Sequence, residues 1–384
     1  MYHLIDVNPG GAEALTITEV SIPDKPRRVY RVCIGSAILP SIIPELRRDW
    51  PSLRLFVVTD ANLRAHGHLA ALLGGHGVDA FVIEPPGEAA KTLGTVETIL
   101  SVLEKARYGR DTLLIALGGG TVGDIAGFVA AIFKRGVPCV QVPTTTVAQA
   151  DSAIGGKVGV DSEFSKNAYG AFHHPARVYM DCATLSTLDD RHFRAGLAES
   201  VKHAMIADAP FLGYLEANLG RILAREPSVL EELGARNCRI KGEVVFKDPE
   251  ELNHRRILNF GHTIGHAVES ASGYRMLHGE CVALGVVGSC LIGESMGLTR
   301  PDIRERAVSL FKQLRLPVSM PRDISETALT EAMARDKKAK SQTPRFVLLQ
   351  ALGEVCAADG QYAVEVRPEV VQAALSALLS HQEA

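Results

Sequence analysis

The sequence predicts an α/β protein in which an N-terminal Rossmann-like domain with a parallel sheet precedes a mostly α-helical C-terminal domain. Up to about residue 185, short β-rich runs alternate with segments whose apolar residues recur at helical spacing, whereas helical spacing dominates beyond residue 188. A chain of 384 residues is also longer than one ordinary hydrophobic core can accommodate. We therefore expect an α/β domain over residues 1–187, which opens with an extension over 1–25, and a helical domain over 188–384.

The elements of each half follow from these runs. Stretches rich in Val, Ile and Leu predict strands over residues 28–35, 54–60, 80–86, 112–120, 139–145 and 177–181. The intervening segments predict helices over residues 38–50, 62–77, 92–109 and 122–136. In the second half we expect helices over 192–219, 228–246, 255–272 and 279–298, with a return to strand near 345–357.

Composition excludes several classes of protein. The net charge of −3 provides no basic footprint for a nucleic acid or a membrane surface. The most apolar stretch, residues 281–293, is shorter than the ~18 residues of a membrane span. Seven scattered cysteines without a C-x-x-C pair, and an N-terminus without a leader pattern, fit a reducing cytoplasm. We expect a cytoplasmic protein whose functional cations are gathered in a pocket.

A glycine-rich turn, "ALGGGTVGDIAGF", follows one predicted strand and opens a helix. Glycines let the backbone approach a pyrophosphate, and the helix N-terminus offers free N–H groups. The motif is not G-x-G-x-x-G, so a simple tight turn is the alternative. Asp60 ends another predicted strand and suits ribose hydroxyls, while "PTTT" at 143–146 adds hydroxyl groups on the same sheet edge. Together they favour a dinucleotide, and Asp60 favours NAD over NADP because it would repel a 2′-phosphate.

A second glycine-rich stretch, residues 148–172, carries polar groups in otherwise small and apolar surroundings. Asp151, Lys157, Lys166 and Asn167 lie within it. A solvated loop would account for the lysines, but an exposed charged run is usually more polar than this segment. Together with Arg135, these groups suit a phosphate.

The helical half contains a polar column. Arg255, Asn259, His262 and His266 follow one another at spacings of four, three and four, which places them on one face of a predicted helix. A lone histidine on an apolar helix is usually a satisfied core residue. Burying the whole column without partners or a ligand would be too costly in free energy.

The same half also offers metal ligands. Glu199 and Lys202 lie three residues apart on one helix face, and His278 precedes the helix predicted at 279–298. Glu199, His262 and His278 can supply the three protein ligands of a zinc site if their helices converge. The H-E-x-x-H motif of metallopeptidases is absent, because Thr263 occupies the glutamate position.

As a set, these residues resemble the 3-dehydroquinate synthase family of sugar phosphate cyclases. The resemblance spans about residues 55–355 and rests on seven blocks in the family's order. It implies the fold of that family, the activity of a carbon–oxygen lyase acting on phosphates, and a homodimer. The blocks are "GGGTVGDIAGFVAA", "KRGVPCVQVPTTTVAQADSAIGGKVGV", "KNAYGAFHHP", "GLAESVKHAMI", "NFGHTIGHAVE", "LHGECVALG" and "DKKAK".

The resemblance also implies a role for each matching position. The metal ligands would be Glu199, His262 and His278, whereas His266, one turn beyond His262, would face the substrate phosphate. The residues that hold NAD would be Asp60, Asn62, Glu88, Lys91, Gly119, Gly120, Asp124, Thr144, Thr145, Lys157, Lys166 and Thr187. The catalytic groups would be Asp151, Lys157, Lys202, Lys241, Arg255, Asn259 and His266, and the further substrate-binding groups Arg135, Asn167 and either Lys337 or Lys338.

The implied reaction has no net redox change. NAD⁺ takes a hydride from a carbinol polarised by zinc or cobalt, phosphate is eliminated, the hydride returns, and the opened sugar closes as a carbocycle. The implied substrate is 3-deoxy-D-arabino-heptulosonate 7-phosphate and the implied product is 3-dehydroquinate.

Departures from the family pattern keep alternatives open. Ser165 replaces the usual glycine before Lys166, and "DPEELNHRR" replaces the usual segment ahead of Arg255. A sister cyclase that acts on sedoheptulose 7-phosphate, glucose 6-phosphate or an amino-analogue of the keto acid is one alternative. A metal-dependent alcohol dehydrogenase is another, although it has no use for the cationic cluster. A catalytically silent relative would not need the complete set of groups.

Overall fold

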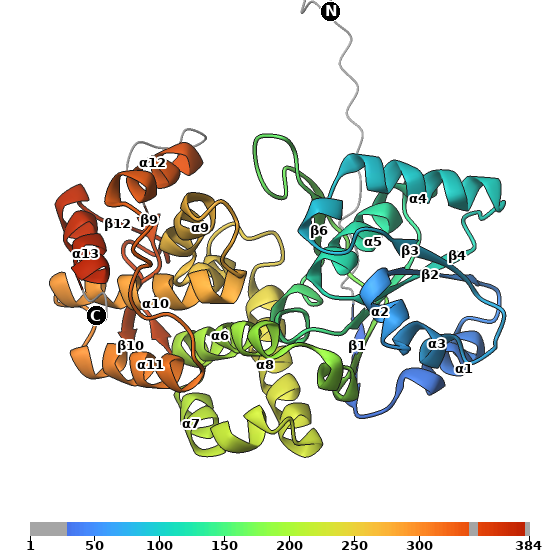
Figure 1. Ribbon diagram of the computed structural model, residues 1–384, viewed down its shortest axis with the longest axis horizontal. Coiled ribbons are helices and arrows are strands. Elements are labelled where there is room, and N and C mark those ends of the chain that lie inside the picture. The colour runs from blue at the N-terminus through green and yellow to red at the C-terminus, as the bar shows by residue number, and fades with distance from the viewer. Residues whose placement is uncertain (1–28, 338–344, 381–384) are drawn as a thin grey trace, which may run out of the picture.

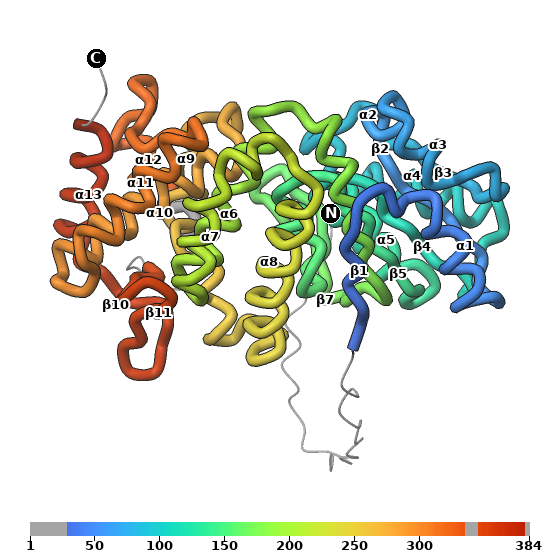
Figure 2. The backbone as a smooth tube through the Cα atoms, turned by 90° about the horizontal axis from the view of Figure 1, so that it is seen from below, coloured from blue at the N-terminus to red at the C-terminus, as the bar shows by residue number. Residues whose placement is uncertain are grey.

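The computed structural model describes residues 29–337 and 345–380, and the extension expected over 1–25 lies outside this range. Figure 1 shows the sheet and its helices on the right and the helices of the second half on the left. Helices α6 (Asp190–Ala207) and α8 (Pro227–Lys247) lie between them. Figure 2 shows the same two parts side by side from below. The division that we propose between residues 187 and 188 falls just before α6.

A six-stranded sheet forms the centre of the first half, and all of its neighbouring strands are parallel. Its order is β1-β8-β5-β4-β2-β3, which confirms all six predicted strands. Strands buried on both faces need continuous apolar runs, and this is why those runs predicted them. The strands are β1 (Arg31–Gly35), β2 (Arg54–Asp60), β3 (Asp79–Ile83), β4 (Thr112–Gly118), β5 (Cys139–Pro143) and β8 (Arg177–Asp181).

Helices cover both faces of this sheet. Leu113, Ile115 and Leu117 of β4 pack with α1 and α3, whereas Leu114 and Ala116 pack with α4 and α5 on the opposite face. The alternation follows from the two-residue period of a strand. These helices are α1 (Leu39–Asp49), α2 (Ala61–Ala65), α3 (His68–Leu73), α4 (Leu93–Lys105) and α5 (Gly120–Ile132).

An antiparallel hairpin of β6 (Lys157–Val160) and β7 (Tyr169–Phe172) was not predicted. Gly159 pairs with Gly170 in its register, so the hairpin lacks the β-branched run that signals a strand. A Cβ on Gly159 would lie 2.6 Å from the carbonyl oxygen of Tyr169, which explains the glycine. A π-helical turn, Ala148–Ser152, precedes the hairpin.

One hydrophobic core joins the helices of the second half. Helix α10 (His278–Ser295) is apolar on all sides, as expected of a helix surrounded by others, and it contacts α6, α9, α11 and α13. No helix of the described residues is both long and apolar enough to cross a membrane. The remaining elements are α7 (Ala209–Leu223), α9 (His262–Ala271), α11 (Pro301–Gln313), α12 (Glu326–Lys337), α13 (Pro368–Ser380), β9 (Arg345–Phe346), β10 (Leu349–Ala351), β11 (Glu354–Val355) and β12 (Val364–Glu365).

Two predicted helices are interrupted at a glycine. Residues 62–77 form α2 and α3 instead of one helix, because Gly67 adopts a φ of 79° between them. Residues 255–272 form a 3₁₀ segment followed by α9, because Gly261 adopts a φ of 80°. A φ in this range is open to glycine without strain, and it ends a right-handed helix.

The break at Gly261 corrects the predicted polar column. Arg255 and Asn259 belong to the 3₁₀ segment His254–Asn259, and only His262 and His266 share a helix. The four side chains therefore do not form one column, and tertiary packing decides which of them meet.

Candidate active site

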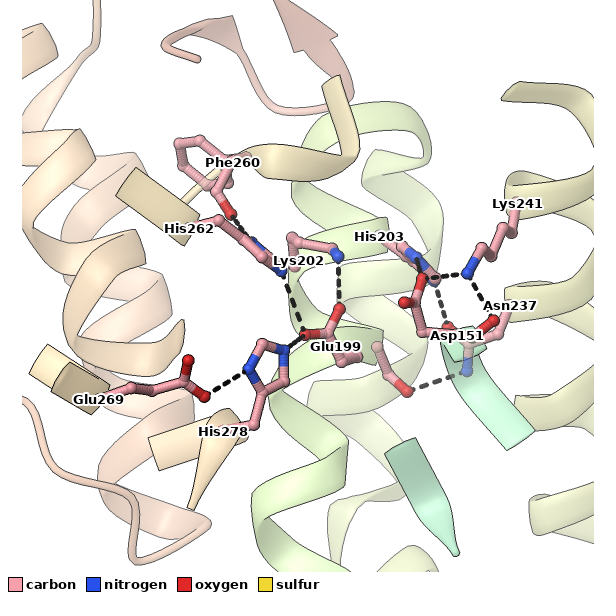
Figure 3. A network of polar contacts seen from close by, with 11 residues as sticks. Asp151, Glu199, Lys202, His203, Asn237, Lys241, Phe260, His262, Glu269 and His278 are labelled. Atoms are coloured by element: carbon pink, nitrogen blue, oxygen red, sulfur yellow. Dashed lines mark hydrogen bonds and ion pairs between the residues drawn. The ribbon is translucent and has the colours of Figure 1, made fainter. Parts of the chain in front are cut away.

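Three donor side chains converge where α6, α9 and α10 meet (Figure 3). Glu199 comes from the middle of α6, while His262 and His278 are the first residues of α9 and α10. His278 Nε2 lies 3.2 Å from Glu199 Oε1, and His262 Nε2 lies 3.9 Å from the same oxygen. Ligand atoms of all three residues lie within 4.8 Å of one another. Two imidazoles and a carboxylate thus face one point.

The charges around this point favour a cation. Burial lowers the pKa of His278, but hydrogen bonds to Glu199 and Glu269 outweigh burial and raise that pKa to about 10. Burial, reinforced by the neighbouring Lys202, holds the pKa of His262 well below its usual range. His262 is therefore neutral, which is the form of imidazole that binds metals. Lys202 is itself buried and forms an ion pair with Glu199.

This donor set fits a divalent metal ion of the zinc type. Two imidazole nitrogens and one carboxylate oxygen are a known ligand set of catalytic zinc sites, which keep a further position open. Glu199 is 0% exposed, so its charge requires cations beside it. A metal ion at this point would displace the proton that His278 otherwise holds.

Glu269 belongs to this site although it was not predicted. Its Oε1 lies 2.9 Å from Nδ1 of His278, and its side chain is buried. The contact lets Nδ1 donate to Glu269, so Nε2 is the nitrogen that would bind a metal ion once its own proton is displaced. The signal was present in the sequence, because Glu269 follows His262 and His266 at helical spacing on α9.

We expect Glu269→Gln to weaken metal binding by about 10- to 100-fold, because an amide orients the His278 ring less firmly than a carboxylate. Competition with a chromophoric chelator measures this affinity directly. Glu294→Gln in α10, which removes a partner of Arg304 outside the site, is the control and should leave metal affinity unchanged. Equal affinity of the wild type and Glu269→Gln would show that this carboxylate does not support the site.

A second group of polar side chains lies beside the first (Figure 3). Nζ of Lys241, from α8, lies 2.8 Å from Asp151 Oδ1 and donates to the main-chain oxygen of Asp151 at 2.5 Å. His203 Nε2 approaches the same Oδ1 at 3.5 Å. Burial raises the pKa of Asp151, but Lys241, Lys202 and His203 outweigh burial and hold it well below its usual range. Asp151 is therefore an ionised carboxylate among buried cations.

Arg255 contributes a further buried cation. Its NH1 donates to the carbonyl oxygen of Pro249 at 2.6 Å and its NH2 to that of Gly155 at 3.0 Å. Its Nε is buried and has no hydrogen-bond partner among the residues that the structure describes. Burial lowers the pKa of Arg255, so its charge is held at a cost that an anionic ligand would reduce.

Glu251 is the second side chain that was not predicted. It forms an ion pair with Lys157 of β6 and accepts from Asn259 Nδ2 at 3.1 Å. Its φ of 59° has no signature in the sequence. The loop around it is held by the carboxylate of Asp248, which accepts from the backbone N–H groups of Leu252, Asn253 and Arg255.

The glycine-rich turn lies at the carboxyl edge of the sheet, between β4 and α5. A Cβ on Gly118 would lie 2.6 Å from Val122, so this glycine serves close packing of strand and helix. Cβ atoms on Gly119 and Gly120 would lie 3.0 Å and 3.1 Å from the side chains of Thr145 and Ser152, respectively. Glycines without side chains leave the backbone N–H groups at the N-terminus of α5 accessible, and this arrangement fits a pyrophosphate.

Polar side chains surround this turn. Lys91 Nζ lies 2.7 Å from Asp124 Oδ2 and donates to Asn167 Oδ1 at 2.5 Å. Lys166 Nζ lies 3.3 Å from Glu88 Oε1. The structure therefore brings together five residues to which the resemblance assigned NAD or substrate binding.

Asp60 has a structural role beside the predicted one. Its Oδ1 accepts from the backbone N–H groups of Asn62 at 2.8 Å and Leu63 at 3.1 Å, which caps α2. Both bonds use Oδ1, so the cap does not occupy Oδ2. Thr144 and Thr145 follow β5 at the same edge of the sheet, and Thr187 Oγ1 lies 2.6 Å from Nε2 of His68.

The structure does not bring every predicted residue to this region. Arg135 is exposed and follows the C-terminal end of α5, whereas the glycine-rich turn opens that helix. A helix of 13 residues separates them by about 20 Å. His266, in contrast, does lie at the site: it is exposed, and its ring is 5.3 Å from that of His262. Lys337 is the last residue of α12, and Lys338 lies outside the described residues.

Two family models match the chain. The model described as 3-dehydroquinate synthase N-terminal matches residues 81–195, and the one described as 3-dehydroquinate synthase C-terminal matches residues 196–339. A 3-dehydroquinate synthase of Symbiobacterium thermophilum is 43% identical over 354 residues, which cover 91% of this chain and 98% of the relative.

Solved structures of related enzymes share the fold. The structure of a 2-epi-5-epi-valiolone synthase from Streptomyces hygroscopicus with NAD⁺ and Zn²⁺ bound has a TM-score of 0.83 at 28% identity, and the match covers 93% of this chain and 99% of that chain. A 2-deoxy-scyllo-inosose synthase complexed with carbaglucose-6-phosphate, NAD⁺ and Co²⁺ has a TM-score of 0.81 at 24% identity, with 90% and 95% covered.

Proposed function

The chain belongs to the 3-dehydroquinate synthase family, and on this premise we propose that it converts 3-deoxy-D-arabino-heptulosonate 7-phosphate into 3-dehydroquinate and inorganic phosphate. It is a carbon–oxygen lyase that uses NAD and a divalent metal ion. One observation carries the proposal for this chain. Glu199, His262 and His278 form a metal-type cluster. Three buried cations lie around it and the neighbouring Asp151: Lys202 pairs with Glu199, Lys241 pairs with Asp151, and Arg255 interacts with Asp151. An anionic substrate would offset the positive charge that these carboxylates leave.

The metal ion and NAD would bind in adjoining parts of this site. When bound, the metal ion supplies a Lewis acid and NAD⁺ a reversible hydride acceptor. Glu199, His262 and His278 would hold the metal ion. Asp151 is ionised next to Glu199, so it would accept a hydrogen bond from a substrate hydroxyl and hold the proton that this hydroxyl gives up.

The cations would bind the acidic groups of the substrate. Lys241 and Arg255 suit its carboxylate, because both are buried and the anion would offset their desolvation. Lys157, Asn259 and His266 suit its phosphate through charge-assisted hydrogen bonds. These roles rest on the resemblance together with the contacts described above.

The carboxyl edge of the sheet would hold NAD. The pyrophosphate would lie against the bare backbone of Gly119 and Gly120 at the N-terminus of α5. The ribose and adenine side would meet Asp60, Asn62 and Thr187. The remaining residues that we propose around the cofactor are Glu88, Lys91, Asp124, Thr144, Thr145, Lys157 and Lys166.

A metal-dependent alcohol dehydrogenase remains the second candidate. Such an enzyme transfers a hydride to or from a simple alcohol and has no charged leaving group to bind. It would gain nothing from burying Lys202, Lys241 and Arg255, each of which loses solvation. The cation cluster therefore favours the cyclase.

Release of inorganic phosphate tests the proposed function. We expect phosphate and 3-dehydroquinate in equal amounts when NAD⁺ is present far below the substrate concentration, because the hydride returns in each turnover. NADH should not accumulate, so the absorbance at its maximum should stay constant. A dehydrogenase would instead stop after consuming the NAD⁺ and leave an equal amount of NADH.

We also propose that the protein acts as a cytoplasmic homodimer. The homodimer follows from the family resemblance. All seven cysteines are free in the structure, as suits a reducing compartment.

A further inference from the structure

A chain of polar side chains runs from Asp151 into the interior of the protein. His203 Nε2 faces Asp151 Oδ1 at 3.5 Å, and His203 Nδ1 lies 2.9 Å from Oδ1 of Asn237 on α8. Asn237 Nδ2 in turn donates to Ser200 Oγ at 2.9 Å. His203, Asn237 and Ser200 are all at most 1% exposed. Neither the resemblance nor the sequence patterns assigned a role to these three residues.

The interior bonds determine how His203 is protonated. Asn237 Nδ2 donates to the carbonyl oxygen of Leu233 at 3.0 Å, and a carbonyl oxygen can only accept. The amide orientation is therefore fixed, and Asn237 Oδ1 is the acceptor that faces His203. Nδ1 of His203 must carry a proton and donate it to Oδ1.

This orientation has a consequence at the other ring nitrogen. With Nδ1 turned to Asn237, Nε2 is the ring atom that faces Asp151, 3.5 Å from Oδ1. Nε2 and Oδ1 are both buried, and neither forms a hydrogen bond in the described part of the chain. Each therefore depends on the other, or on the ion pair with Lys241, to offset its burial.

The contacts also distinguish the two oxygens of Asp151. The contacts of Lys241 and His203 with this carboxylate are both made to Oδ1. Asp151 lies next to the metal-type cluster, because one of its oxygens is within 4.8 Å of a ligand atom of Glu199. Because a carboxylate is planar, holding Oδ1 in place also limits the directions in which Oδ2 can point.

We propose that His203 is a positioning residue for Asp151: its Nε2 lies against Oδ1 and so keeps Oδ2 directed at the substrate hydroxyl. The proposal rests on the function proposed above and adds to it a residue behind the reacting groups. It also gives Asn237 a role, because the amide fixes the ring that holds the carboxylate. A misplacement of about 1 Å in such a group is enough to cost about 100-fold in rate.

Two substitutions separate this role from simple packing. His203→Gln extends an amide to the position of Nε2, so it keeps a donor for Asp151 and loses the bond to Asn237. His203→Asn reaches only to the position of Nδ1, so it keeps the bond to Asn237 and loses Asp151. We expect kcat to fall about 10- to 100-fold in His203→Asn and less than about 5-fold in His203→Gln, with KM nearly unchanged in both.

Thermal stability should rank the two variants in the opposite order. His203→Asn retains the interior hydrogen bond to Asn237 and should have the higher Tm, while His203→Gln should have the higher kcat. A purely structural histidine predicts that kcat follows Tm. Such a result, or a wild-type kcat in both variants, would overturn the proposal.

Two further measurements keep the test decisive. If both variants fold poorly, Asn237→Leu leaves His203 in place but removes its anchor, and kcat should fall about 3- to 10-fold at constant KM. An unchanged kcat there would also overturn the proposal. Wild-type turnover, measured first, tests the proposed function separately. If the keto acid phosphate is not a substrate, the same ratios are taken with the sugar phosphate that the wild type does convert.

Discussion

His262→Ala should lose its bound metal ion and at least about a thousandfold in kcat/KM at the same time, because a metal Lewis acid contributes several kcal/mol to the transition state. His262 Nε2 lies 3.9 Å from Glu199 Oε1, the oxygen that His278 Nε2 also approaches. Its pKa is already held low by burial, so no proton competes strongly for this nitrogen. Metal analysis of protein purified without chelator measures the first effect, and phosphate release measures the second.

His266→Ala is the matched control, one helical turn away on the same helix. It should keep the metal ion and mainly raise KM, since we assign His266 to the substrate phosphate. This control also tests a second possible metal site, because His266, Glu269 and His278 form an alternative donor group with ligand atoms within 4.8 Å of one another. If His266→Ala lost the metal ion and His262→Ala retained it, the metal site would have to be assigned to that alternative group instead.

Arg255→Ala should remove most of the preference for a substrate that carries a carboxylate. Breaking a buried charge-assisted contact costs about 2–5 kcal/mol, which corresponds to about 30- to several thousandfold in kcat/KM for the heptulosonate phosphate. Sedoheptulose 7-phosphate lacks the carboxylate, so its kcat/KM should change far less. Burying Arg255 and Lys241 together without an anion would be unfavourable, and this is why we expect the wild type to prefer the acid.

Arg256→Ala, at the adjacent position, is the control for this experiment and should retain the preference. Arg255→Lys keeps a charge in the pocket and distinguishes loss of charge from loss of the bonds to Pro249 and Gly155. Faster turnover of sedoheptulose 7-phosphate by the wild-type enzyme would refute the substrate assignment and leave the cyclase mechanism standing.

Those parts of the fold that depend on local pattern could be predicted from the sequence. The six strands of the parallel sheet are apolar runs whose burial on both faces requires such runs. The hairpin of β6 and β7 was not predictable in this way, because Gly159 and Gly170 replace the residues that signal a strand. The break at Gly261 was missed because a glycine within a helical pattern is often tolerated.

In the candidate site, too, the sequence predicts residue types but not the contacts that tertiary packing creates. The residue types of the metal-type cluster could be named, but only the packing of α6, α9 and α10 shows that Glu199 and His278 approach each other. Glu251 and Asp248 act through a loop with a positive φ, which has no periodic signature. His203 was not singled out because a buried histidine on a helix has no pattern that distinguishes it from a core residue.

The placement of Glu199 and His278 also bears on how the chain resists unfolding. The two residues lie 79 positions apart, and the protein has no disulfide among its described residues to tie distant segments together. A metal ion held by both would act as a reversible cross-link that closes a long loop. In the chain-entropy treatment used for disulfides, closing a loop of this size lowers the conformational entropy of the unfolded chain and so stabilises the fold by about 4.5 kcal/mol. The ion that activates the substrate would thus also hold α6 and α10 together. Unlike a disulfide, this cross-link does not need an oxidising environment to form.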